Sequence, residues 1–204
     1  KKEGRFLDFN SKYEIFLEEL VEQADFTDIF LSNPANEVQG LVGGNVQILE
    51  EKYPDNFFDV ITAFEVIDRI FDPRTALQTI YNTLNKGGLA YFTTLSGSGF
   101  DLRILKGHSR SLIPPIHLNL ISVEGMIDLL DNIGYEIVEM SSPGSLDVNL
   151  VENAINDKDK NISIPEFLDD IINHRSDEVR NAFQRFLQKS KLSSHLRIIA
   201  KKTK

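Results

Sequence analysis

Residues 58–73 read FDVITAFEVIDRIFDP, and this stretch decides the fold class. Together with Phe57, its first half is a largely apolar run that predicts a buried strand ending at Phe64. Its last two residues, Asp72 and Pro73, are a helix N-cap and a proline suited to the first helical position. The stretch therefore predicts a buried strand, a turn and the start of a helix, which is the repeating unit of an α/β sheet.

The same alternation of short apolar runs and helical periodicity extends to both sides of this stretch. Further strands are predicted at residues 5–9, 28–31, 46–49, 89–95, 135–140 and 196–200. Helices are predicted at residues 12–23, from Pro73 to a stop at Gly87-Gly88, and from a Ser122 cap to Ile133, with at most a turn or two of helix within 35–45. The first of these helices is expected to turn Ile15, Phe16, Leu17 and Leu20 to one face. Residues 96–121 are predicted to be a loop of Gly, Ser and Pro.

Residues 145–194 change to a helical pattern and predict an insertion before the last strand. Ser163 and Glu166 have the spacing of a capping box, and Ser176 is placed to cap a further helix. The expected inward residues are Phe167, Leu168, Ile171 and Ile172 on one helix, and Val179, Phe183, Phe186 and Leu187 on the next. The polar run at 156–161 predicts a surface loop. We expect one domain over residues 1–204, with the insertion acting as a lid.

Composition excludes several classes of protein. The chain has 204 residues, 41% of them hydrophobic, which is enough to bury a core. With 31 acidic and 22 basic residues its net charge is −9, a field that repels nucleic-acid phosphates and anionic lipid surfaces. Without cysteine it has no disulfide or thiolate metal site, and a reducing compartment, the cytoplasm, is expected. No apolar run is long enough to span a membrane, and the absence of an initial Met predicts an excised piece.

Three segments resemble the class I S-adenosylmethionine (SAM) dependent methyltransferases, of the type 11 and type 23 bacterial branch that acts on small molecules and glycans. Residues 58–73 are similar to that family's "FDVV...EVLEHVPDP" segment, and residues 84–94 to its "LKPGG" turn and fifth strand. His117-Leu-Asn-Leu-Ile-Ser122 is similar to the stretch before the next helix. The resemblance covers about residues 5–140. It implies a Rossmann-like, doubly wound sheet of seven strands in the order 3-2-1-4-5-7-6, with the last strand antiparallel.

The resemblance also implies a SAM site over the carboxyl ends of strands one, two and four. On this alignment Asp8 ends the first strand, and Asn10-Ser11-Lys12-Tyr13-Glu14 stands where the family has a glycine-rich loop, which predicts crowding. Ser32 and Asn33 stand where the family has the acid that holds the ribose. The charge of Lys12 is expected to repel the sulfonium and ammonium groups of SAM.

The remaining site residues follow from the same alignment. Glu50 lies near the expected adenine position, with a plain surface residue as the alternative. Phe64 and Glu65 lie beside the expected methyl donor, and Phe64 is expected to fill the core rather than to pack on the cofactor. His117, on the loop facing the acceptor, is the candidate general base, with a structural histidine as the alternative. Arg69 replaces the histidine of "EVLEH" and is expected to be exposed. No His, Asp and Glu set has metal-ligand spacing, and no strand is followed by a G-x-S-x-G elbow.

Two interpretations of the function stay open. One is a SAM-dependent methyltransferase with a small-molecule or glycan-linked acceptor, in which the protein mainly aligns donor and acceptor. The other is a methyltransferase-like binding module in which the altered residues 10–14 and 32–33 abolish cofactor binding. A domain that binds another nucleotide is a third interpretation, against which the missing glycines also argue. The acceptor and the oligomeric state cannot be derived from the sequence.

Overall fold

The computed structural model describes residues 4–49, 53–157 and 162–203 of the chain. A seven-stranded sheet with the order β3-β2-β1-β4-β5-β7-β6 forms its centre. The strands are β1 (Arg5–Asp8), β2 (Asp28–Leu31), β3 (Val46–Ile48), β4 (Phe58–Phe64), β5 (Leu84–Leu95), β6 (Tyr135–Ser141) and β7 (His195–Lys202). Strands β1 to β5 pair in parallel, and β7 lies antiparallel between β5 and β6. The expected strand order and the antiparallel last strand are confirmed.

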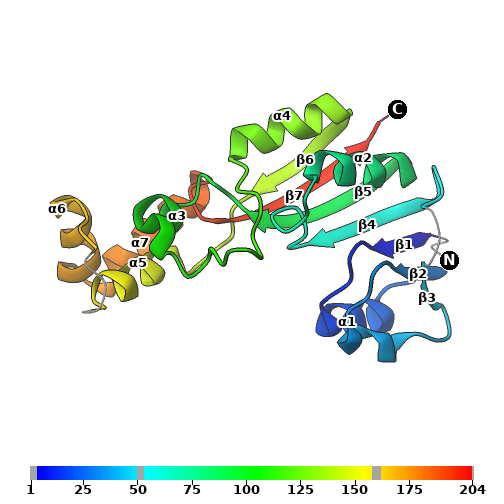
Figure 1. The fold of residues 1–204 in the computed structure, drawn as a ribbon, viewed down its shortest axis with the longest axis horizontal. Helices are drawn as coiled ribbons and strands as arrows, with labels where there is room; N and C mark the ends of the chain where they lie inside the picture. The colour runs from blue at the N-terminus through cyan, green and yellow to red at the C-terminus, as the bar shows by residue number, and fades with distance from the viewer. Residues whose placement is uncertain (1–3, 50–52, 158–161, 204) are drawn as a thin grey trace.

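Helices cover both faces of this sheet (Figure 1). On one face lie α2 (Pro73–Thr83) and α4 (Val123–Ile133), and on the other lie α1 (Glu14–Gln23) and the 3-10 helix η1 (Asn36–Leu41). The two predicted caps are confirmed: Asp72 Oδ1 accepts from the Thr75 N–H at 3.0 Å, and Ser122 Oγ accepts from the Gly125 N–H at 3.0 Å. Leu7, Phe58, Ile61 and Phe92 are fully or nearly fully buried between the layers.

Several expected boundaries and faces were wrong. Helix α2 ends at Thr83 rather than at Gly87-Gly88, because β5 begins at Leu84 and pairs there with Phe58. In α1, Ile15 is 78% exposed, since the helix begins at Glu14 and presents Leu17 to the core. The segment 96–121 is not only loop, because α3 (Phe100–Leu105) and the 3-10 turn η2 (Lys106–His108) form within it.

The helical segment before β7 lies beyond the ends of the strands (Figure 1). It contains α5 (Asp147–Ile155), α6 (Glu166–Asp169), the π-helix η3 (Asp170–His174) and α7 (Asp177–Lys189). With α3 these helices share a small core of their own around Val151, Ile172 and Leu187. The lid role of residues 145–194 stays a prediction.

Two expectations for this segment were wrong, and a third was confirmed in position only. The predicted capping box is not formed, because the N-cap of α6 is Pro165 and no side chain bonds the helix start. Ser176 is the N-cap of α7 but makes no side-chain cap bond. Phe167, Val179 and Phe186 were expected to point inward, but they are 71%, 41% and 54% exposed. The helices of this segment share one small core, which buries only part of each helix surface. In the described ranges no helix is both long and apolar enough to cross a bilayer.

Candidate functional site at the carboxyl ends of the strands

Three parallel strands end side by side, and the chain after each turns through a left-handed conformation. Asp8 at the end of β1 is in register with Leu31 of β2 and Thr62 of β4. Asn10, Asn33 and Glu65 then have φ values of 64°, 43° and 53°. Asparagine tolerates this region better than most residues other than glycine. The loop after β1 therefore makes a left-handed turn with asparagine rather than glycine at Asn10.

Asp8 is a buried carboxyl group at the centre of this edge, with 3% of the residue exposed. Its Oδ1 accepts a hydrogen bond of 2.6 Å from Thr62 Oγ1. Burial raises its pKa from 3.8 to about 6, and the opposing effects of Thr62, Ser11 and the Lys12 charge are smaller. A cation placed beside Asp8 would therefore stabilise the charged form of its buried carboxyl group.

The loops after β1 and β2 are tied together by short hydrogen bonds. The Asn10 N–H donates to Ser32 Oγ at 2.9 Å, and the Ser11 N–H donates to the Ser32 carbonyl at 3.0 Å. The Ser32 N–H donates in turn to the Asp8 carbonyl at 3.1 Å. Ser32 is 1% exposed, so its hydroxyl supports the loop, whereas Asn33 is exposed at the surface. Of the two candidate ribose ligands, Asn33 is the one open to a ligand.

Charged groups gather around the turn that follows β4. Lys12 is half-buried, and its pKa is lowered by burial and by the charge of Arg69, against the opposing charges of Asp68, Glu65 and Asp8. Lys12 therefore lies among three carboxyl groups and one guanidinium. Tyr13, which follows it, is 39% exposed and does not fill the interior of this edge.

Three carboxylate oxygens of this group are buried and accept no hydrogen bond from the described residues. They are Glu65 Oε1 and both carboxylate oxygens of Asp68. Burial, followed by the charge of Glu65, raises the pKa of Asp68. Arg69 Nε, expected to be exposed, is instead buried 3.8 Å from Asp68 Oδ2. Carboxylate oxygens left without donors are expected to attract a cationic ligand.

His117, the candidate base, has both ring nitrogens engaged, and its side chain is 6% exposed. Its Nδ1 accepts from the Ile113 N–H at 3.0 Å, and its Nε2 lies 3.4 Å from Asp68 Oδ2. The imidazole accepts a proton only after one of these contacts opens. This geometry favours the alternative of a structural histidine that holds Asp68.

A second histidine, which the sequence did not single out, lies beside Glu65. His195 begins β7 opposite Leu95, the last residue of β5. Its Nδ1 is 3.4 Å from Glu65 Oε1, and its side chain is 40% exposed. The carboxylate favours the tautomer with a proton on Nδ1, which leaves Nε2 free to accept one. Nothing in the local sequence of His195 signals this position, because only the sheet order places β7 next to β5 and so brings the start of β7 near the residue that follows β4.

Phe64 and Glu50 are the two predicted site residues not yet described. Phe64 is half-buried and packs edge-on against Phe16 and Tyr91, with ring centroids 4.8 and 5.1 Å away. Phe64 therefore packs in an aromatic cluster between α1 and β5, and its contact with the cofactor stays a prediction. Glu50 lies outside the described residues.

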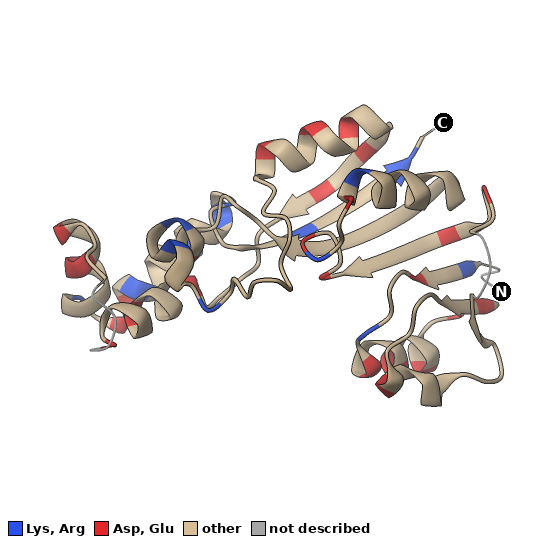
Figure 2. Cartoon of the chain, in the orientation of Figure 1, with Lys and Arg blue, Asp and Glu red and all other residues tan. Residues whose placement is uncertain are grey.

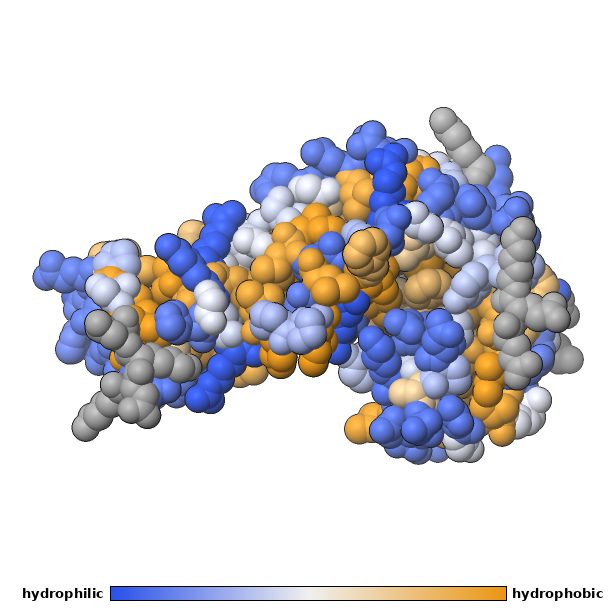
Figure 3. All heavy atoms as spheres, viewed as in Figure 1, coloured by the Kyte–Doolittle hydropathy of each residue, from blue (hydrophilic) through white to orange (hydrophobic). Residues whose placement is uncertain are grey.

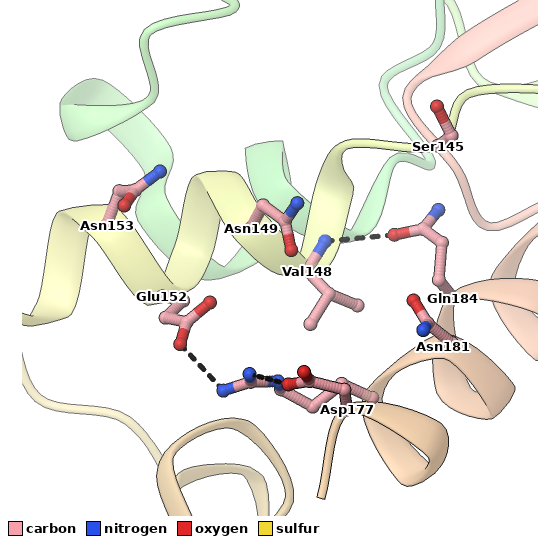
Figure 4. A pocket seen from close by; sticks show the side chains of 9 residues that line it. Ser145, Val148, Asn149, Glu152, Asn153, Asp177, Asn181 and Gln184 are labelled. Carbon is pink, nitrogen blue, oxygen red and sulfur yellow. Dashed lines mark hydrogen bonds and ion pairs between the residues drawn. The ribbon is translucent and has the colours of Figure 1, made fainter.

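A separate cavity lies between α5 and α7 (Figure 4). Its volume is about 440 Å³, and Val148 is the one apolar residue among those that line it. Arg180 crosses the cavity and pairs with Glu152 at 2.7 Å and with Asp177. Gln184 accepts from the Val148 N–H at 3.0 Å and donates to Asp147 at 2.8 Å, so it holds the two helices together.

Comparisons with known proteins agree with this architecture. Residues 1–140 match the family model described as "Methyltransferase domain". No curated protein matches the chain. A SAM dependent methyltransferase from Archaeoglobus fulgidus is 16% identical, with 99% of this chain and 87% of that chain covered and a TM-score of 0.61.

Two further solved structures show how broadly the fold is used. An S-adenosylmethionine dependent methyltransferase from Mesorhizobium loti is 12% identical, with a TM-score of 0.60 over 97% of this chain and 90% of that chain. The [4+2]-cyclase SpnF is 16% identical, with a TM-score of 0.57 over 98% of this chain and 75% of that chain. At such low identity these likenesses establish the fold alone.

Proposed function

The chain belongs to the methyltransferase domain family as a SAM-dependent methyltransferase, and we propose that its acceptor is a small molecule or a glycan-linked group. The observation that supports the proposed site is the set of buried carboxylate oxygens of Glu65 and Asp68 that accept no hydrogen bond from the described residues, in the turn after β4. A sugar or another small polyol would offer a hydroxyl group as the nucleophile.

The residues present fit the charged part of SAM. Asp8 and Glu65 would hold its ammonium and sulfonium charges, and the left-handed turn at Asn10 would let the backbone approach. The amide of Asn33 would bond the ribose. When bound, SAM supplies an electrophilic methyl group for in-line displacement by the acceptor. The predicted repulsion by Lys12 is offset by the three carboxyl groups around it.

We further propose that His195 and Glu65 handle the proton of the acceptor. Glu65 orients the imidazole through Nδ1, and Nε2 takes the proton from the acceptor hydroxyl as the methyl group is transferred. His117 acts as a positioning residue in this scheme, since it holds Asp68 and the Ile113 backbone.

The donor is tested by calorimetric titration of the purified chain with SAM and with its demethylated product. Heat at micromolar ligand is expected for the unchanged chain, and Glu65→Gln is expected to weaken binding about tenfold through loss of one charge contact. Glu18→Gln, on the exposed surface of α1, is the matched control and is expected to bind normally. A flat trace to millimolar ligand would reject SAM binding by this chain and favour the binding-module interpretation.

The proton path is tested by transfer of a labelled methyl group to pools of free sugars and small hydroxylated molecules. His195→Gln is expected to lower kcat about a hundredfold or more, because the acceptor hydroxyl loses its base. His117→Gln is expected to lower kcat by less, since His117 only positions Asp68. A larger loss of kcat for His117→Gln than for His195→Gln would assign the proton to His117.

A further inference from the structure

In the segment from Ser109 to Ile121, called the strap here, polar side chains point inward and aliphatic side chains are exposed to solvent. Its polar His117 and Asn119 turn inward. Its aliphatic residues face outward, with Ile113 51%, Ile116 49%, Leu118 52% and Leu120 41% exposed. Scattered exposed hydrophobic residues are ordinary, but an apolar outer face backed by polar anchors is not. Such an exposed apolar surface is typical of a site that another molecule covers.

The strap is held in this orientation at both ends. At one end, Ser109 Oγ and Ser111 Oγ donate to Asp101 Oδ2 at 3.0 and 2.8 Å. At the other, the Leu118 N–H donates to the Asp68 carbonyl at 2.7 Å, and Asn119 Nδ2 donates to the Ile70 carbonyl at 2.6 Å. Turning the aliphatic side chains inward would break these bonds and leave buried acceptors unpaired. The exposed apolar face is therefore built into the fold.

Phe71 extends the same surface. It is 94% exposed and directly follows Ile70, whose carbonyl accepts from Asn119. Figure 3 shows hydrophobic residues gathered across the middle of the visible face, in the region of the segment between β5 and α4 in Figure 1. Together with Phe71, the strap forms one apolar patch beside the carboxyl end of β4.

The stretch of sequence that leads into the strap is cationic although the whole chain is negative, whereas the exposed Asp72 follows Phe71 and Glu124 lies near the charge of Arg103. The chain carries −9, yet between Asp101 and Glu124 it contains Arg103, Lys106 and Arg110 and no acidic residue. All three cations are exposed. Figure 2 shows acidic residues on α1, α4 and the outer helices, and also at the end of β4 and in the turn that leads into α2.

We propose that the strap, Phe71 and these cations dock the protein on an anionic lipid surface. Aliphatic and aromatic side chains entering the headgroup region beside lysine and arginine are the combination that holds a peripheral protein there. A symmetric pairing of two copies through the patch would set the same cations against each other, which argues against a dimer. On the lipid surface the nearby end of β4 would lie at the level of the headgroups. The proposal does not depend on the reaction that the site performs.

The test is sedimentation of the whole chain with vesicles of phosphatidylcholine alone and of phosphatidylcholine mixed with phosphatidylglycerol. We expect binding to the mixed vesicles that weakens with salt, because the cationic contribution is screened. Arg103→Gln and Arg110→Gln are each expected to lower the partition coefficient roughly fivefold. Ile116→Ser with Leu118→Ser is expected to lower it at least about tenfold, through the lost apolar contact.

Matched controls separate the patch from the rest of the surface. Ile15→Ser removes an aliphatic residue that is 78% exposed on α1 and is expected to leave binding unchanged. The thermal unfolding midpoint of every variant is expected to stay near that of the unchanged chain, since all the altered side chains are exposed. The proposal is overturned by failure to sediment with the mixed vesicles at low salt, or by equal binding of the patch variants. It is also overturned if ultracentrifugation shows a dimer that Ile116→Ser with Leu118→Ser dissociates.

Discussion

The buried carboxyl group of Asp8 predicts that replacing it by asparagine makes the protein more stable at neutral pH. The folded chain raises its pKa from 3.8 to about 6, mainly through burial. Between these two values the folded state binds more protons than the unfolded state, so this group's contribution to stability falls as the pH rises. At 1.36 kcal/mol per pH unit, the full effect above pH 6 is about 3 kcal/mol.

Asp8→Asn removes the charge and keeps an oxygen that accepts from Thr62. The variant and the unchanged chain are expected to have similar free energies of unfolding below about pH 4, where the carboxyl is protonated in both states. Above pH 6 the variant is expected to be more stable by up to about 3 kcal/mol. Urea denaturation across this pH range measures the difference. The same variant is expected to bind SAM more weakly, because it lacks the charge proposed to hold the donor.

Asp25→Asn is the control, since Asp25 is exposed beyond the end of α1. It is expected to show no comparable growth of the difference with pH. The reasoning is refuted if Asp8→Asn is less stable at all pH values, or if its difference from the unchanged chain does not grow between pH 4 and about pH 6.

Two further predictions concern the scaffold of the site. Asp147 accepts four hydrogen bonds, from Gln184, from Ser193 and from the N–H and hydroxyl of Ser194. Asp147→Ala is therefore expected to lower the free energy of unfolding, measured by heat or urea, by about 3–5 kcal/mol. A cost below about 1 kcal/mol would show that these bonds do not join α5 to β7. At the left-handed Asn10, Asn10→Gly is expected to change stability by less than about 1 kcal/mol, whereas Asn10→Val is expected to cost about 1–3 kcal/mol. Equal effects of the two substitutions would contradict the assignment of backbone strain.

Most of the sheet was predictable because its signals are local. The apolar run at 57–64, the Asp72-Pro73 start and the Ser122 cap each act within a few residues, and each is found where expected. The expectations that were wrong lie where a neighbour overrides the local pattern. Pairing of Leu84 with Phe58 ended α2 early, and the narrow core of the helical segment left Phe167 exposed.

The candidate site was predictable only in part. The carboxyl ends of the strands marked Asp8 and Glu65, because parallel strands end at one edge. Asp68 lies within the stretch that decided the fold, yet its burial beside His117 depends on the strap folding back over the turn after β4. The absence of glycine at residue 10 predicts crowding, which stays a prediction, and the backbone there makes its left-handed turn with asparagine.

By itself the sequence determined the alternation of strands and helices, the buried faces of the strands and the overall negative charge. These follow from apolar periodicity, capping residues and composition, which act over short distances or over the whole chain. Only the tertiary structure decided that His195 meets Glu65 and that the strap turns its aliphatic side chains to the surface. Such contacts join segments far apart in the chain, and their energies depend on burial and partners that no local pattern encodes.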